Sequence, residues 1–279
     1  MQPNWIDHKG MTLIELLFAI GIMGMVSTAI YQLLIVHHAN YRFQQSVMDR
    51  QQNGRIALST LAREVRWIGY GLLDTAPSGL SDQHSCHPWL STRPFEVVNG
   101  RAIRFLSNLH GIHTVLPRDA LPGDTEIFIP DDRSIQENGL AISRGREFER
   151  NDTIYIYNLS ATGGQNETPI AQYRECHRLA SRGASGRIRL ALGDSIRRHF
   201  PAGSPVYVVN ELHYFLDSDR ERLMRRLDGG TEVLAEGVED VSFRADGDQI
   251  LIRLTMKATG RQFSDYGYPV ETSVTVRNQ

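Results

Sequence analysis

The hydrophobic and polar positions of this sequence change pattern along the chain. Residues 11–36 form an almost unbroken apolar run in which Glu15 is the single charged residue. As a helix this run would extend over roughly 39 Å, enough to cross a hydrocarbon core of ~30 Å. Beyond it, apolar residues recur at helical spacing as far as Ile68. The pattern therefore predicts one continuous helix over about residues 12–68.

After Leu72 the sequence consists of short apolar runs that are separated by Gly, Pro, Asn and Asp. Such runs predict β-strands, and the lack of alternating helical segments favours antiparallel pairing. Turn residues at 246–248 predict a hairpin. The predicted class is α+β, a long N-terminal helix packed on an antiparallel β-sheet head. The predicted strands cover residues 102–106, 126–130, 153–157, 187–192, 206–215, 241–244, 250–257 and 270–277.

Composition changes this picture only a little. The chain has 279 residues, 41% of them hydrophobic, and its 30 basic and 32 acidic side chains give a net charge of −2. That profile excludes wholesale disorder and a polytopic membrane protein, and it leaves ample chain for a core. The near-neutral charge speaks against a protein built to coat nucleic acid. Because no motif points to catalysis, we predict no catalytic residues.

The apolar run has two ordinary interpretations, a signal anchor and a secretory signal peptide that is cut after Ala29. Neither explains a carboxylate that costs on the order of 2.5–3.5 kcal/mol to place in a membrane. Cleavage after Gly10 would create a new α-amino group on Met11 and make Glu15 the fifth residue of the mature chain. Between neighbouring subunits, that amine and carboxylate would neutralise each other.

The segment KGMTLIE at residues 9–15 resembles the class III signal of type IV pilins and pseudopilins. In that family a prepilin peptidase cuts after the Gly and the new N-terminus is methylated. A Glu at the fifth mature position guides filament assembly. The departure is Met11, where Phe is usual. The resemblance implies processing between Gly10 and Met11 and an assembly role for Glu15.

Further segments of the sequence resemble one branch of this family, the minor pilins. Residues 48–71 are similar to the stem-to-head segment of PilW-type minor pilins, and residues 234–244 and 271–278 to their closing β-segment. J-type minor pseudopilins of type II secretion share a looser version. The resemblance implies a type IV pilin-like fold with a leader peptide at 1–10, a transmembrane and filament-core helix at 11–36, an amphipathic stem helix at 37–71 and a periplasmic β-rich globular head at 72–279.

The function implied by the resemblance is a minor pilin subunit of a type IV pilus that takes part in assembly or priming at the tip. It implies a structural subunit, not an enzyme. The implied partners are prepilin peptidase, other minor and major pilins, the inner-membrane assembly platform and membrane lipid. The charge balance speaks against nucleic acid as a partner. The implied location is the inner membrane, with a single span and a periplasmic head, and then the pilus. Two alternatives stay open, a J-type pseudopilin and a membrane-anchored periplasmic adhesin or enzyme.

The two cysteines, Cys86 and Cys176, each precede a histidine. If the head is exported, the oxidising compartment favours a disulfide between them, with free thiols and a metal site as the alternatives. The run HSCH at 84–87 has poor ligand spacing, and the chain holds no CxxC pair. The acidic turns at 217–221 and 246–248 lack a complete calcium loop. We therefore predict no metal site and no cofactor.

Overall fold

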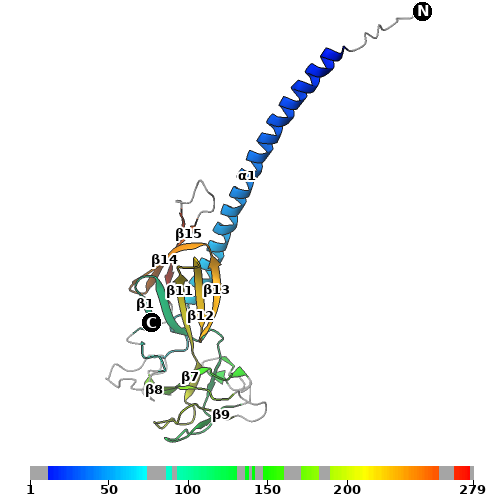
Figure 1. Cartoon of the computed structure of the whole chain (residues 1–279). Coiled ribbons are helices and arrows are strands. Elements are labelled where there is room, and N and C mark those ends of the chain that lie inside the picture. Colours follow the sequence, from blue (N-terminus) through cyan, green and yellow to red (C-terminus); the bar gives the residue numbers. More distant parts are fainter. Residues whose placement is uncertain are drawn as a thin grey trace, which may run out of the picture. The chain divides into compact units, whose positions relative to one another are not determined.

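The chain forms one long N-terminal helix, α1 (Leu13–Val65), followed by antiparallel sheets (Figure 1). This is the α+β class that the sequence predicts. The chain divides into two compact units, one with α1 up to Arg50 and the other with α1 from Gln51 and the strands given below. The computed structural model describes residues 12–73, 86–89, 93–130, 136–137, 140–141, 147–159, 171–181, 189–257 and 267–276.

Two sheets in the second unit lie beside the end of α1. The first has five strands in the order β1-β2-β11-β12-β13, and the second has three in the order β14-β15-β16. All neighbouring strands are antiparallel. The strand bounds are β1 (Phe95–Val98), β2 (Ala102–Ser107), β11 (Asn210–Asp217), β12 (Arg222–Leu227), β13 (Gly230–Glu236), β14 (Val238–Asp246), β15 (Gln249–Lys257) and β16 (Gly267–Thr275).

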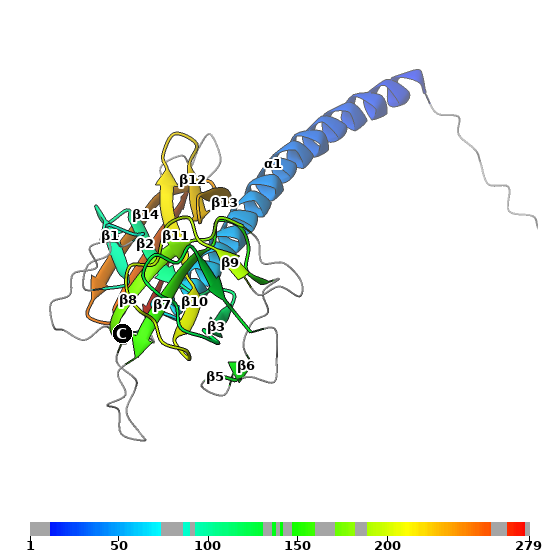
Figure 2. The ribbon, with the colours of Figure 1, turned by 90° about the horizontal axis from the view of Figure 1, so that it is seen from below.

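The remaining described strands form separate sheets, and a second hydrophobic cluster lies among them. Four of them pair antiparallel in the order β3-β10-β7-β8 and lie side by side in Figure 2. Two short pairs, β4 with β9 and β5 with β6, complete the set. The bounds are β3 (His113–Val115), β10 (Pro205–Val208), β7 (Thr153–Leu159), β8 (Ala171–Arg178), β4 (Glu126–Phe128), β9 (Arg189–Ala191), β5 (Gln136–Glu137) and β6 (Leu140–Ala141).

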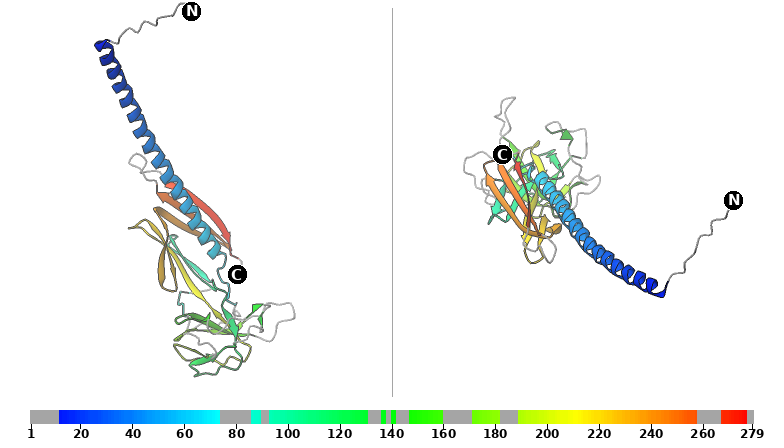
Figure 3. Two further views of the ribbon diagram at one scale, coloured as in Figure 1. Left: turned by 90° about the vertical axis from the view of Figure 1, so that its right-hand side faces the viewer. Right: turned by 90° about the horizontal axis from the view of Figure 1, so that it is seen from above.

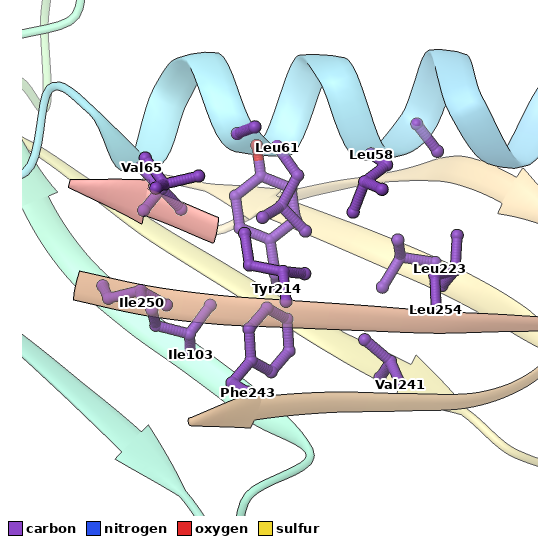
Figure 4. Packing of buried hydrophobic residues seen from close by; sticks show 14 of the residues in the cluster. Leu58, Leu61, Val65, Ile103, Tyr214, Leu223, Val241, Phe243, Ile250 and Leu254 are labelled. Carbon is purple, nitrogen blue, oxygen red and sulfur yellow. The ribbon is translucent and has the colours of Figure 1, made fainter. Parts of the chain in front are cut away.

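The last turns of α1 bury their apolar face on the first two sheets. Leu58, Leu61 and Val65 point into a core with Tyr214 and Leu254 (Figure 4). The left view of Figure 3 shows β14–β16 alongside this end of the helix. At Gly54, an added Cβ would lie 2.9 Å from the Cγ atom of Met256. The absence of a side chain therefore lets helix and sheet approach closely.

Two expectations need correction in detail. The run 206–215 is not one strand, because the chain leaves the four-stranded sheet after β10 and joins the five-stranded sheet as β11, with Val209 between them. The helix also ends at Val65 rather than Ile68. Gly69 and Gly71 follow with φ of 77° and 79°, a conformation that glycine adopts without strain. The predicted hairpin is confirmed, since Asp246 pairs with Gln249 across a two-residue turn.

Candidate functional site

The first turn of α1 contains Glu15. Its Oε2 atom accepts hydrogen bonds from the backbone N–H and the hydroxyl of Thr12, at 2.9 and 3.1 Å. The N–H of Glu15 donates to Oγ1 of Thr12 at 3.3 Å. This reciprocal pair is a capping box, which satisfies backbone donors that the helix start leaves unpaired. The Thr-x-x-Glu spacing carried this signal in the sequence. The predicted processing residues Gly10 and Met11 lie outside the described residues.

The apolar run forms the outside of the same helix. Every residue from 13 to 36 is exposed, including Phe18 at 68%. Within the described part of the chain, α1 is the helix that is long and apolar enough to cross a membrane. A continuous apolar surface of this kind needs lipid or protein against it, because water solvates it poorly.

The structure brings Cys86 and Cys176 together in a disulfide, with their Cα atoms 5.9 Å apart. Cys176 is buried on β8, opposite Tyr155 of β7. The bond thus fixes the segment 86–89 to the four-stranded sheet. The neighbouring His87 is buried as well, and its Nδ1 atom lies 3.0 Å from the hydroxyl of Tyr155. Burial lowers the pKa of His87 to about 4, so its ring is neutral at neutral pH.

The histidines that directly follow the two cysteines, His87 and His177, make different contacts. Among the described residues, no group of three or more His, Cys, Asp or Glu side chains is placed to hold an ion. His177 instead hydrogen-bonds two carboxylates. Its Nδ1 atom lies 2.8 Å from Asp194 and its Nε2 atom 3.2 Å from Glu175. The acidic turns at 217–221 and 246–248 connect strands of the first two sheets.

His177 gives the second unit a pH dependence. Burial by itself lowers its pKa, but the hydrogen bonds to Glu175 and Asp194 outweigh burial and raise the pKa above its ordinary value. The folded state therefore binds this proton more tightly than the unfolded chain. The resulting stability is complete below the ordinary histidine pKa of about 6.5 and is lost as pH rises through the raised pKa.

We expect the free energy of unfolding to fall by about 1–2 kcal/mol more in the wild type than in His177→Gln between about pH 6 and pH 9, as for a charged hydrogen bond. Urea unfolding at the two pH values measures this difference. An equal loss in both proteins would contradict it. His199, which is exposed and lies 2.9 Å from Asp119, provides the matched control as His199→Gln, which should follow the wild type.

Sequence reasoning missed a buried ionic network between α1 and the five-stranded sheet. Glu64 of α1 accepts two hydrogen bonds from Arg225 of β12, at 2.9 and 3.0 Å. The hydroxyl of Tyr214 on β11 also bonds Glu64. Glu232 of β13 accepts a further bond from Arg225 at 2.6 Å. The available signal was Glu64 itself, an acid placed on the apolar face of a helix next to Val65.

Comparison with known proteins identifies the N-terminal part of this arrangement. Residues 6–31 match the family described as the prokaryotic N-terminal methylation motif. The motif is characteristic of type IV pilins and pseudopilins and marks substrates of prepilin peptidase. The matched residues include the start of α1 with Thr12 and Glu15. The chain therefore carries a prepilin-type N-terminus ahead of its antiparallel sheets.

The comparisons with curated proteins and solved structures add no further argument. No curated protein matches the sequence. Among solved structures, the endosialidase of phage phi92 is matched at 7% identity and a TM-score of 0.18, over 61% of this chain and 33% of that one. The chain thus spans about a third of that protein's length, and a likeness of this size carries no argument about fold or activity.

Proposed function

We propose that this chain is a minor pilin subunit of a type IV pilus, of the PilW type, and that it acts as a structural subunit and not as an enzyme. The observation that carries the proposal is the methylation motif at residues 6–31. The exposed apolar half of α1 supports it, since such a helix suits first a membrane and then a filament core. We propose that residues 1–10 form the leader, residues 11–36 the membrane helix, residues 37–71 the stem and residues 72–279 the head.

In this proposal the leader is removed in the inner membrane while the head lies in the periplasm. Glu15 then neutralises the new α-amino group of a neighbouring subunit as helices bundle. The capping box bears on this step, because Thr12 holds the Glu15 carboxylate in the first turn of α1. The proposed partners are prepilin peptidase, other minor and major pilins and the assembly platform, and the proposed place of action is the pilus tip.

N-terminal mass spectrometry tests the processing. In cells with prepilin peptidase we expect the mature chain to begin at a methylated Met11. Without the peptidase, or in Gly10→Val, we expect the leader to remain. A chain that still begins at Met1 in normal cells would overturn the proposal. A cut after Ala29 would show a secretory signal peptide instead.

Replacement of Glu15 tests the assembly step. We expect Glu15→Ala to be cleaved normally but to enter pili at least roughly tenfold less, because a buried amine is left unpaired. Glu15→Gln separates two roles, since Gln can still complete the capping box but carries no charge. Quantitative immunoblots of sheared pili should show the same loss for both variants. Normal incorporation of Glu15→Gln would mean that the cap, and not the charge, matters.

A J-type pseudopilin of type II secretion would carry the same motif. Deletion of the gene separates the two functions. We expect loss of surface pili with normal secretion of exoproteins. Loss of secretion with normal pili would assign the chain to the secretion system.

A further inference from the structure

Residues 193–199 lie against β8, the edge strand of the four-stranded sheet, and we call them the strap. Tyr173, Glu175 and His177 alternate along β8, so their side chains leave the same face of the sheet. Each of these three side chains holds a different residue of the strap. The contacts run from the ring of His177 to the carboxylate of Asp194, from the carboxylate of Glu175 to the N–H of Arg197, and from the hydroxyl of Tyr173 to the carbonyl of His199.

The strap also covers part of the second hydrophobic cluster. Ile196 is 1% exposed and belongs to this cluster together with Ile154 and Phe200. The N–H of Gly193 donates to the carbonyl of Arg178 at 2.7 Å. After that residue the strap is fastened to β8 by side chains. A contact of this kind depends on the charge of the side chains that make it.

The contacts of His177 require a protonated ring. Its Nδ1 atom lies 2.8 Å from a carboxylate oxygen of Asp194 and its Nε2 atom 3.2 Å from one of Glu175. An ionised carboxylate only accepts hydrogen bonds, so both ring nitrogens must donate, and only the imidazolium ion has two N–H groups. The side chain of His177 is 2% exposed, so water cannot replace either carboxylate while the strap is in place.

Loss of the ring proton leaves the carboxylate of Glu175 poorly paired. This side chain is 10% exposed, and its Oε1 atom has no hydrogen-bond partner among the described residues. If the neutral imidazole turns its single N–H to Asp194, the Oε2 atom of Glu175 keeps only the N–H of Arg197. A buried carboxylate with so few donors is costly, and water relieves the cost. Water reaches Glu175 when the strap leaves β8.

The surroundings of His177 contribute no other charge to this contact. The neighbouring strand β7 places the apolar Ile154 opposite it, and Arg178 lies on the other face of β8 by alternation. The remaining charged groups of the strap and of the turn behind it have contacts elsewhere. Arg197 is exposed, Arg198 lies over the ring of Tyr173 at 5.1 Å, His199 lies 2.9 Å from Asp119, and Asp124 accepts a bond from the N–H of Leu121.

We propose that the strap is a pH-controlled lid, which protonated His177 holds on β8 and which opens on loss of that proton to uncover Ile196 and the cluster beneath. Because the pKa of His177 is raised above its ordinary value of 6.5, the lid is closed below that value and opens as pH rises through the raised pKa. In alkaline surroundings the second unit would then present additional apolar surface. The inference does not depend on the proposed function, since all its contacts lie within the second unit.

Hydrogen exchange of the Arg197 amide measures the opening, since this N–H is bonded to Glu175. The full-length chain in detergent is labelled at about pH 6 and pH 9, single amides are resolved by fragmentation mass spectrometry, and the rates are corrected for base catalysis. We expect protection of this amide to fall about tenfold, as for loss of one charged hydrogen bond. Low concentrations of urea should hardly change it, whereas amides of β15 should respond strongly, because a local opening exposes little surface.

Three variants identify the group that controls the opening. His177→Gln should show at pH 6 the low protection that the wild type reaches at pH 9, with no further change. Asp194→Asn, at an exposed position, should lower protection at pH 6 and reduce the pH change, and it serves as the test if His177→Gln folds poorly. His199→Gln is the matched control. It removes the other histidine of the strap and should keep the full tenfold change.

Equal protection of the Arg197 amide at the two pH values in the wild type would overturn the inference. An undiminished pH change in His177→Gln or Asp194→Asn, or its loss in His199→Gln, would do the same. A urea response as strong as that of β15 would mean that the strap opens only when the whole unit unfolds, which would equally refute the lid.

Discussion

Replacement of Arg225 by alanine is expected to lower the free energy of unfolding of the second unit by about 3–5 kcal/mol, the range for breaking a buried ion pair. Only 14% of the Arg225 side chain and 12% of the Glu64 side chain are exposed. Removal of the guanidinium group leaves the Glu64 carboxylate with the hydroxyl of Tyr214 as its remaining partner in this network. The loss is large because an uncompensated charge stays buried.

The network joins α1 to strands that are far from it in the sequence. Arg225 on β12 bonds Glu64 on α1 and Glu232 on β13. Burial raises the pKa of Tyr214 above its usual range, so the hydroxyl keeps its proton and can donate to Glu64. Loss of Arg225 therefore weakens the attachment of the stem to the sheet as well as the sheet itself.

Urea unfolding of the detergent-solubilised chain, followed by tryptophan fluorescence, measures the change. Arg226→Ala is the matched control, because Arg226 is the exposed neighbour on β12. Loss of its hydrogen bond to Thr231 and of its contact with the Phe215 ring should cost about 1 kcal/mol or less. The triple variant Glu64→Leu, Tyr214→Phe, Arg225→Met should recover much of the loss, since apolar groups replace the whole network. Equal effects of Arg225→Ala and Arg226→Ala would contradict the buried network.

Removal of the disulfide is the second large effect. The double variant Cys86→Ser, Cys176→Ser is expected to lose about 4–5 kcal/mol, because the bond closes a loop with a sequence separation of 90 and so restricts the unfolded chain. The segment 86–89 that the bond holds includes the buried His87. Its release would also expose the ring of His87 and the hydroxyl of Tyr155 to water.

The same unfolding assay, with and without reductant, checks this expectation. Reductant should bring the wild type to the stability of the double variant and should leave the variant itself unchanged. Non-reducing peptide mapping identifies the bonded pair directly. A double variant as stable as the oxidised wild type would show that the bond contributes nothing to folding.

The sequence was sufficient where a local pattern decides the outcome. The apolar run 11–36 and the helical spacing beyond it predicted a long helix, because helical hydrogen bonds and side-chain spacing are local. Alternation along residues 250–257 predicted β15 for the same reason. The prepilin-type signal around Glu15 could likewise be recognised from the sequence, since a peptidase recognises a short contiguous segment.

Tertiary structure decided what depends on residues distant in the chain. Nothing local divides the run 206–215 between two sheets, because the choice lies with the partners β7 and β2. The roles of Glu64 and His177 have the same origin. Glu64 of α1 can be buried because Arg225 of β12 donates hydrogen bonds to its carboxylate. The proton on His177 is held because its ring hydrogen-bonds the carboxylate of Asp194. Composition and periodicity report which side chains avoid water, whereas the pairing of buried charges is set only when separate segments come together.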